Sequence, residues 1–271
     1  MAFRRVLAWS AFVSIAAGTL LLSLGGCAST HSETGISANI VTPSDETDTR
    51  RRARLRLELA SGYFEEGKTE VALDEVKQAL VIDSSFAEAY DLRGLILMRL
   101  SDNSAAEENF RRAISLNPRD ANPHHNLGWL LCQEKRYPQA QGEFDIAMAS
   151  PIYPGRSKTL LAQGVCEARA GKLPEAEKSL SRSYELDPGN PVTGYNLANL
   201  LFRRGENTRA QFIIRRINNS ELANAESLWL GIKIERRLND MVALRQLGDV
   251  LRKRFAGSPQ TAKYERGAFD E

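Results

Sequence analysis

The sequence has few of the residues that build catalytic or metal sites. Among its 271 residues are three histidines and three cysteines. The adjacent pair His124 and His125 would point about 100° apart around a helix axis, so the two rings cannot share one metal ion well. No H-E-x-x-H, G-x-S-x-G or phosphate-binding glycine loop is present. These absences predict a protein that is not an enzyme and that uses no metal, cofactor or small-molecule substrate.

An excess of charge of either sign is also absent. The formal net charge is +2, and removal of Arg4 and Arg5 with an N-terminal leader leaves 34 basic against 34 acidic residues. Aromatic residues make up only 7% of the chain, and no basic block alternates with them. The composition therefore predicts no nucleic-acid partner.

Long hydrophobic runs are absent except at the N-terminus. Arg4 and Arg5 precede an uncharged stretch over 7–24, which ends in L-G-G-C at Cys27. This pattern resembles the bacterial lipoprotein signal. The resemblance implies a signal peptide over 1–26, cleavage before Cys27 and fatty acyl chains such as palmitate attached through its thiol. Ala28 follows the lipidated cysteine, which implies an anchor on the periplasmic face of the outer membrane. The alternative is an uncleaved membrane anchor, for which about 18 apolar residues are barely long enough.

The segment directly after Cys27 shows no periodic spacing of apolar residues. Residues 28–49 are rich in serine and threonine, a composition that predicts a flexible segment. We therefore expect residues 27–52 to hold the lipidated cysteine and a tether.

The rest of the chain is a repeat. Small residues recur at intervals of 34, 34, 36, 34 and 33, namely Ala60, Gly94, Gly128, Gly164, Ala198 and Gly231. Alanines recur in step with them at Ala72, Ala106, Ala140, Ala176, Ala210 and Ala243. The spacing resembles the tetratricopeptide repeat (TPR) family, whose helix–turn–helix unit is about 34 residues long. The resemblance implies an all-α, right-handed superhelical solenoid over 53–257. Its six repeats are expected over 53–86, 87–120, 121–154, 157–190, 191–223 and 224–257, followed by a C-terminal tail over 258–271.

The first helix of each repeat lines the concave surface of a TPR array. Carried onto this chain, the groove-facing positions predict an apolar partner-binding groove formed by Leu95, Met98, Trp129, Leu161, Val165, Tyr195, Asn199, Phe202 and Ile232. A contiguous exposed apolar surface usually marks a partner site. The alternative is that several of these side chains are buried between repeats. Some TPR domains hold a C-terminal carboxylate with Lys and Asn of their first repeat; Leu57 and Ser61 stand there instead, so we expect no such clamp.

Two cysteines fall in the expected first helices of neighbouring repeats. Cys132 is in repeat three and Cys166 in repeat four. In an oxidising periplasm the two thiols can pair, provided that their Cα atoms come within about 7 Å. We predict a disulfide; the alternative is two buried free thiols that pack as small apolar groups.

The whole arrangement resembles one family of lipoproteins. A lipobox at Cys27, a short tether and six repeats are combined with A-I-S-L-N-P-R-D at 113–120, H-N-L-G-W-L-L-C at 125–132 and Y-N-L-A at 195–198. This resembles the type IV pilus biogenesis lipoproteins of the PilF/PilW type, the secretin pilotins. The resemblance implies an assembly chaperone that binds pilus secretin subunits and reaches the membrane through its lipid. Two alternatives stay open: a TPR lipoprotein of the β-barrel assembly machinery, and an adaptor for periplasmic proteases or cell-wall hydrolases.

Overall fold

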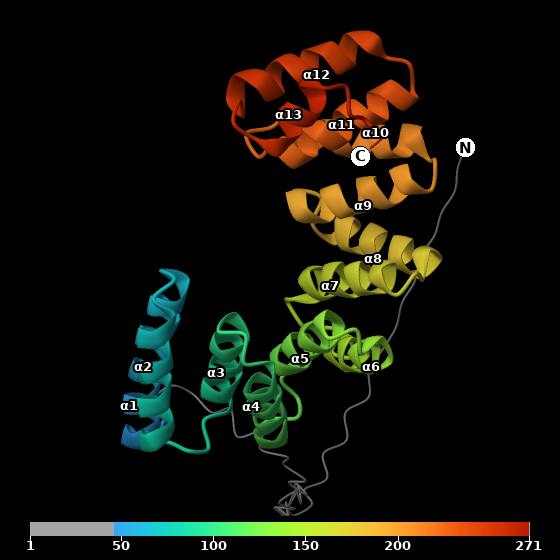
Figure 1. Cartoon of the computed structure of the whole chain (residues 1–271). Coiled ribbons are helices and arrows are strands. Elements are labelled where there is room, and N and C mark those ends of the chain that lie inside the picture. Colours follow the sequence, from blue (N-terminus) through green and yellow to red (C-terminus); the bar gives the residue numbers. More distant parts are fainter. Residues whose placement is uncertain (1–45, 271) are drawn as a thin grey trace, which may run out of the picture. The chain divides into compact units, whose positions relative to one another are not determined.

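The computed structural model describes residues 46–270, which form thirteen helices and no strand (Figure 1). The helices are α1 (Asp48–Glu65), α2 (Thr69–Ile82), α3 (Ala87–Arg99), α4 (Asn103–Leu116), α5 (Ala121–Gln133), α6 (Tyr137–Met148), α7 (Arg156–Arg169), α8 (Leu173–Leu186), α9 (Pro191–Arg203), α10 (Asn207–Asn218), α11 (Ala225–Arg237), α12 (Met241–Arg254) and α13 (Pro259–Glu265). The prediction of an all-α repeat fold is confirmed. The predicted signal peptide, Cys27 and most of the expected tether lie outside the described residues.

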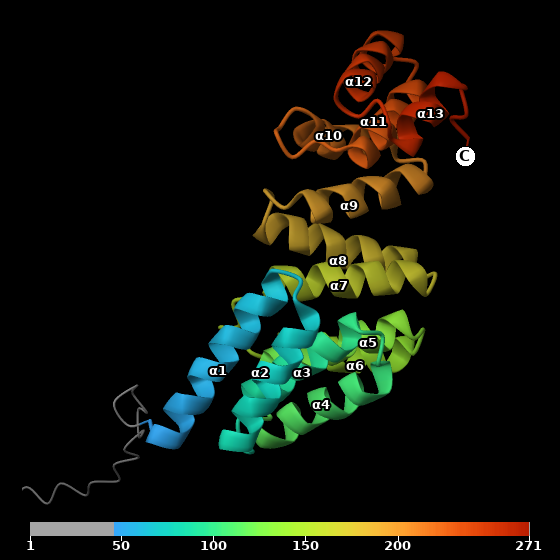
Figure 2. The same cartoon turned by 60° about the vertical axis from the view of Figure 1, so that its left-hand side comes forward.

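Helices α1 to α12 form six hairpins that follow one another along the chain (Figure 2). Each odd-numbered helix packs against the even-numbered helix that follows it, and each even-numbered helix packs against the next hairpin. Successive first helices, from α1 to α11, also contact one another. Contacts between helices more than two positions apart do not occur within 46–270, as expected where every repeat is stabilised only by its neighbours.

A left-handed residue closes the first helix of every hairpin. Gly67, Gly171 and Gly205 have φ angles of 77° to 79°, while Ser101, Lys135 and Asn239 have φ angles of 58° to 65°. In the first hairpin the N–H of Lys68 donates to the carbonyl of Tyr63 across this residue, at 2.8 Å. This bond satisfies a helix-end carbonyl as in the Schellman motif. The motif turns the chain sharply, so the second helix can pack back on the first.

The hairpins pack because a small residue on the first helix faces a large one on the second. A Cβ added to Gly94 would come within 2.5 Å of the Phe110 ring, and one added to Gly128 would lie 2.8 Å from the Phe144 ring. Phe110 and Phe144 are fully buried. The recurring small residues of the sequence therefore mark the points where paired helices approach closely.

Replacement of Gly128 by leucine is expected to overpack the third hairpin. The new side chain meets the buried Phe144 ring and, at 3.3 Å, the backbone oxygen of Ala140, which cannot move without shifting α6. We expect a loss of about 1–3 kcal/mol in the free energy of unfolding, measured by urea unfolding. Gly142→Leu is the matched control, since its Cβ would meet nothing within 4 Å. Equal stability of the two variants would contradict this packing.

Both ends of the array differ from the sequence prediction. Helix α1 begins at Asp48, inside the range expected to be tether, because the Thr47 side chain caps it by accepting a hydrogen bond from the N–H of Arg50. At the other end the expected tail contains α13, which packs on α11 and α12. The Phe269 ring stacks on Trp229 at 5.6 Å, so this segment covers the last repeat.

Candidate functional site

A pocket of about 440 Å³ lies between the first helices of four successive repeats. Figure 1 shows these helices, α3, α5, α7 and α9, following one another along the array. The pocket is lined by Leu95, Met98, His125, Asn126, Trp129, Lys158, Leu161, Ala162, Val165, Arg169, Val192 and Asn196. Helix α7 supplies lining residues along nearly its whole length, while α5 and α9 stand on its two sides. The pocket is therefore an elongated surface that needs four repeats to form.

The structure brings most of the predicted groove residues to this surface. Five of them line the pocket, namely Leu95, Met98, Trp129, Leu161 and Val165. Asn199 lines an adjoining hollow of about 210 Å³, which shares Val165, Arg169 and Asn196 with the pocket. Tyr195 and Phe202 are half-buried and pack against the core around α9 and α10, so less of their surface is open.

Ile232 was expected in the groove, and this part of the prediction is wrong. Its side chain is fully buried in a cluster with Trp229 and Leu244. Tyr264 packs on the same cluster from α13, and Phe269 packs on it from the segment after that helix. The covering of the last repeat therefore removes Ile232 from the surface.

The sequence prediction omits two asparagines of the pocket. Asn126 and Asn196 lie at equivalent positions in α5 and α9, immediately after the groove-facing positions used for the prediction. Their recurrence in the segments N-L-G at 126–128 and N-L-A at 196–198 was visible in the sequence. Polar residues that recur at the same position of different repeats, next to apolar groove positions, could have identified these two asparagines.

Buried polar bonds tie the first helices together below the pocket. The Asn126 side-chain amide on α5 donates to both carboxylate oxygens of Asp91 on α3, at 2.9 and 3.0 Å. His125 Nδ1 lies 2.9 Å from Thr159 Oγ1 on α7. Burial lowers the pKa of His125 to about 4, with a smaller contribution from the Lys158 charge. The ring is therefore neutral at pH 7, and its Nδ1 is suited to accept the Thr159 hydroxyl proton.

The Asp91 carboxyl group has the opposite perturbation. Burial raises its pKa to about 6, although the hydrogen bond from Asn126 favours the charged form. Between about pH 4 and 6 the native state thus holds more protons on Asp91 than the unfolded state does, and stability falls as the pH rises. At His125 the unfolded state holds more protons over the same range, so stability rises with pH. The two contributions oppose each other.

Single substitutions are expected to separate these contributions. Relative to the wild type, Asp91→Asn should become more stable as the pH rises from 4 to 6, whereas His125→Gln should become less stable. The difference in free energy of unfolding between each variant and the wild type is expected to change by up to about 1.4 kcal/mol per pH unit. Urea unfolding at pH 4, 5 and 6 measures both. Profiles parallel to the wild type would show that neither group titrates in this range.

A disulfide also joins two of the pocket helices. Cys132 on α5 and Cys166 on α7 are bonded, with their Cα atoms 5.7 Å apart, within the range that a disulfide requires. Both cysteines are buried and belong to the core that supports Trp129. The covalent link therefore fixes the spacing of two walls of the pocket.

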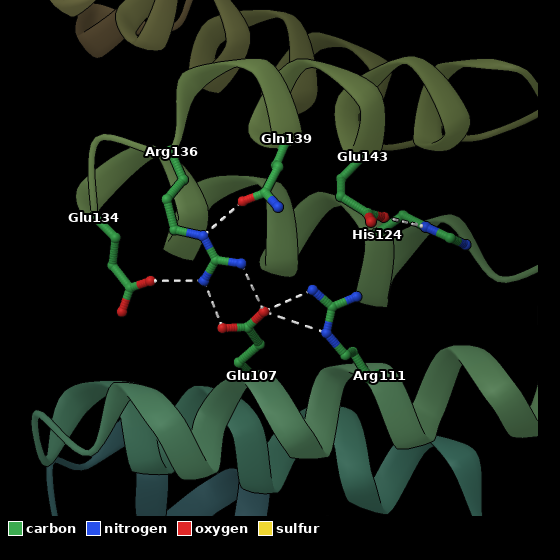
Figure 3. A network of polar contacts seen from close by, with 7 residues as sticks. All are labelled: Glu107, Arg111, His124, Glu134, Arg136, Gln139 and Glu143. Atoms are coloured by element: carbon green, nitrogen blue, oxygen red, sulfur yellow. Dashed lines mark hydrogen bonds and ion pairs between the residues drawn. The ribbon is translucent and has the colours of Figure 1, made fainter.

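A larger polar network stands apart from the pocket (Figure 3). The Arg136 guanidinium, in the turn between α5 and α6, bonds Glu107 on α4, Glu134 and Gln139. Hydrogen bonding from Arg136, and then from Arg111, lowers the pKa of Glu107. None of the residues drawn in Figure 3 lines the pocket. Glu107 and Arg136 are half-buried, and they join α4 to the turn between α5 and α6, so the network supports the packing of repeats two and three.

Another hollow, of about 640 Å³, lies on α1 around Leu55, Leu59 and Tyr63. All of its lining comes from this one helix and the residue after it, so no second element supplies an opposing wall. No group of three metal-ligating side chains occurs among the described residues. No helix within 46–270 is both long and apolar enough to cross a bilayer.

A hollow of about 460 Å³ between α10, α11 and α12 has a lining made mostly of polar residues, in which Arg215 pairs with Glu235 and Asp240. The pocket between α3 and α9 is the candidate site, because it combines an apolar floor with walls from four repeats.

Known proteins resemble this chain in repeat type, sequence and structure. Models of the tetratricopeptide repeat match residues 87–120, 109–142 and 167–228. The type IV pilus assembly protein PilF of Pseudomonas aeruginosa is 27% identical over 209 residues, which cover 77% of this chain and 83% of PilF. An uncharacterised protein of Haemophilus influenzae is 25% identical over 50% of this chain and 75% of its own length.

Two solved structures resemble the chain over most of its length. The crystal structure of PilW, described as a widely conserved type IV pilus biogenesis factor, has a TM-score of 0.72 and 28% identity and covers 78% of this chain and 97% of PilW. The structure of PilF from Pseudomonas aeruginosa has a TM-score of 0.71 and 26% identity, covering 80% of this chain and 99% of that one. Sequence and structure thus point to the same relatives.

Proposed function

Because the chain is a tetratricopeptide-repeat protein homologous to PilF, we propose that it acts in type IV pilus biogenesis as a lipid-anchored pilotin. In this role it binds a segment of the pilus secretin subunit and helps the subunits to multimerise at the outer membrane. The observation that carries the proposal is the pocket between α3, α5, α7 and α9, whose floor is apolar although it lies open at the surface. Exposed apolar surface of this kind is characteristic of partner sites.

The proposed mechanism needs binding and confinement, without catalysis. A secretin subunit exposes apolar surface and unpaired strand edges before its ring closes, and such edges associate with one another indiscriminately. The pocket shields one segment of the subunit. Lipid on Cys27 holds the complex at the membrane, and the tether raises the local concentration of captured subunits without any new contact. Two or more acyl chains suffice for stable anchoring.

Deletion of the gene, followed by a gel of unheated membranes, tests this function. We expect secretin multimers to be lost while monomers survive, because assembly rather than synthesis fails. Restoring the gene should restore the multimers. Complementation with Cys27→Ser separates the anchor from the pocket, since this variant keeps the pocket and loses the lipid; we expect monomers that do not reach the outer membrane. Unaltered multimers in the deletion strain would overturn the proposal.

A further inference from the structure

We infer that the pocket takes an extended peptide segment with an apolar centre and acidic residues at its ends. The inference rests on the proposed function and names the chemistry of the bound segment. It starts from the charges at the pocket. Lys158 and Arg169 are its charged lining residues, and Arg203 adds a third cation in the adjoining hollow. Neither lining contains an aspartate or a glutamate, and His125 is neutral at pH 7 because its pKa is about 4. The Asp91 carboxylate below the pocket, with a pKa of about 6, offsets part of the Lys158 charge, but the exposed arginines keep the surface net positive, which favours an anionic partner.

Three of the arginines on this side of the array occupy one repeat register. Arg99, Arg169 and Arg203 are the final residues of α3, α7 and α9, and all three are exposed. A basic residue in the last turn also stabilises its helix through the helix dipole, by about 0.3–1 kcal/mol. That effect explains a cation at each helix end, but it leaves the charge on the surface unneutralised.

Within residues 46–270 these three arginines form no ion pair with a carboxylate, unlike Arg111 and Arg136 on neighbouring elements. The Arg99 guanidinium lies over the Phe64 ring, 4.1 Å from its centroid, and that of Arg169 over Trp129 at 5.2 Å. Arg99 also donates a hydrogen bond to the carbonyl of Phe64 at 3.1 Å. The contact with a ring holds each guanidinium in place and leaves further N–H groups without a partner in the part of the chain that the structure describes. This is a suitable geometry for receiving a carboxylate through two hydrogen bonds.

The spacing of the two cations sets the length of the segment that the pocket can bind. Lys158 and Arg169 stand eleven positions apart on α7, which is about 16 Å along a helix axis. Between them Leu161, Ala162 and Val165 form an apolar floor. An extended chain covers 16 Å in about five residues. Because successive side chains of an extended chain point to opposite faces, two acidic residues reach the same surface only when an even number of positions separates them. A segment with two acidic residues four positions apart and apolar residues between them turns both carboxylates and its middle residue toward the pocket, and the long side chains of Lys158 and Arg169 span the remaining distance.

The asparagines favour an extended segment over a helical one. The Asn196 amide donates to the carbonyl of Val192 at 2.8 Å, and the Asn126 amide donates to Asp91. Each side chain keeps its carbonyl oxygen, which has no hydrogen bond within the described residues, as an acceptor at the pocket wall. An extended chain offers unpaired backbone N–H groups to such acceptors, whereas a helix has already satisfied most of its own.

Fluorescence anisotropy with labelled peptides tests the inference on the full chain purified in detergent. The probe has an alanine, a leucine and an alanine between two aspartates, so that the aspartates and the leucine share one face of the extended chain; its counterparts carry asparagine or lysine at the two ends. We expect the aspartate peptide to bind at least tenfold more tightly than the asparagine peptide and to weaken as salt rises, while the lysine peptide does not bind. Equal binding of all three peptides would overturn the inference.

A charge reversal makes the test specific to one site. Arg169→Glu should weaken the aspartate peptide at least tenfold and should gain affinity for the lysine peptide. The matched control is Arg182→Glu on α8, an exposed arginine that pairs with Glu185 and does not line the pocket. Circular dichroism checks that both variants fold.

The outcomes separate this inference from the proposed function. If Trp129→Ala abolishes secretin multimers while Arg169→Glu changes neither the multimers nor peptide affinity, the recognition of acidic residues is wrong and the pilotin role stands. If vesicles containing phosphatidylglycerol bind in an Arg169-dependent manner and the aspartate peptide does not, the cations serve a lipid surface and the inference fails.

Discussion

Replacement of Cys132 and Cys166 by alanine is expected to lower the free energy of unfolding by about 3–4 kcal/mol. The disulfide closes a loop of 34 residues, and the chain-entropy model assigns a contribution of this size to such a loop. Alanine suits the two sites because both are buried in an apolar cluster, where serine would bury an unpaired hydroxyl group. A loss of this size lowers the melting temperature of a domain of about 220 residues by roughly 10 °C.

Reduction of the wild-type protein supplies the control for this prediction. A reducing agent should lower the melting temperature of the wild type toward that of the double variant, and it should leave the double variant unchanged. When the wild-type protein is unfolded in denaturant without reductant, titration of its thiols should find neither Cys132 nor Cys166 free. Two free thiols, or a double variant as stable as the wild type, would show that this cysteine pair is not oxidised.

The repeats could be predicted from the sequence because the same packing contact requires the same type of residue in each of them. A small residue on each first helix is needed wherever a large side chain of the second helix, such as Phe110 or Phe144, crosses it. That requirement recurs at every repeat and is visible without a structure. Helices α3, α5 and α9 begin at residues 87, 121 and 191, where the repeat spacing places the start of a unit.

The ends of the array could not be predicted in the same way. Thr47 caps α1 through a local side-chain bond, and no repeat register marks that position. Helix α13 has only seven residues and is stabilised by packing on α11 and α12. A repeat pattern says where a unit recurs, and it says little about what covers the last one. The misplacement of Ile232 follows directly from this.

The candidate site was predictable in part. Residues such as Leu161 and Val165 reach the pocket because the TPR register fixes the direction in which they point. The register does not reveal which polar side chains are already paired. The hydrogen bond from Asn126 to Asp91 depends on the spacing of α3 and α5, and the position of the Arg169 guanidinium over the Trp129 ring depends on the spacing of α5 and α7. Both required the structure.

If the pocket binds the secretin segment as proposed, truncation of Trp129 to alanine is expected to reduce the affinity for that segment by about 2–4 kcal/mol, a loss of thirtyfold or more. Trp129 is the largest side chain that lines the pocket, and a buried aromatic contributes 150–250 Å² of contact, on the order of several kcal/mol. Its loss also removes the ring under Arg169, so the guanidinium is no longer held at the pocket wall.

The fold should survive this substitution, because Trp129 is only partly buried and lies at the edge of its cluster, while Leu127 and Leu130 on the same helix are fully buried. The measurement pairs circular dichroism melting with secretin pull-down. Phe212→Ala is the matched control, since Phe212 is 77% exposed on α10 and does not line the pocket; it should leave binding unchanged. If Trp129→Ala abolishes folding together with binding, Trp129 is a core residue, because only a side chain that supports the helix pair can do both. If the variant folds and binds secretin as well as the wild type does, the partner site lies outside this pocket.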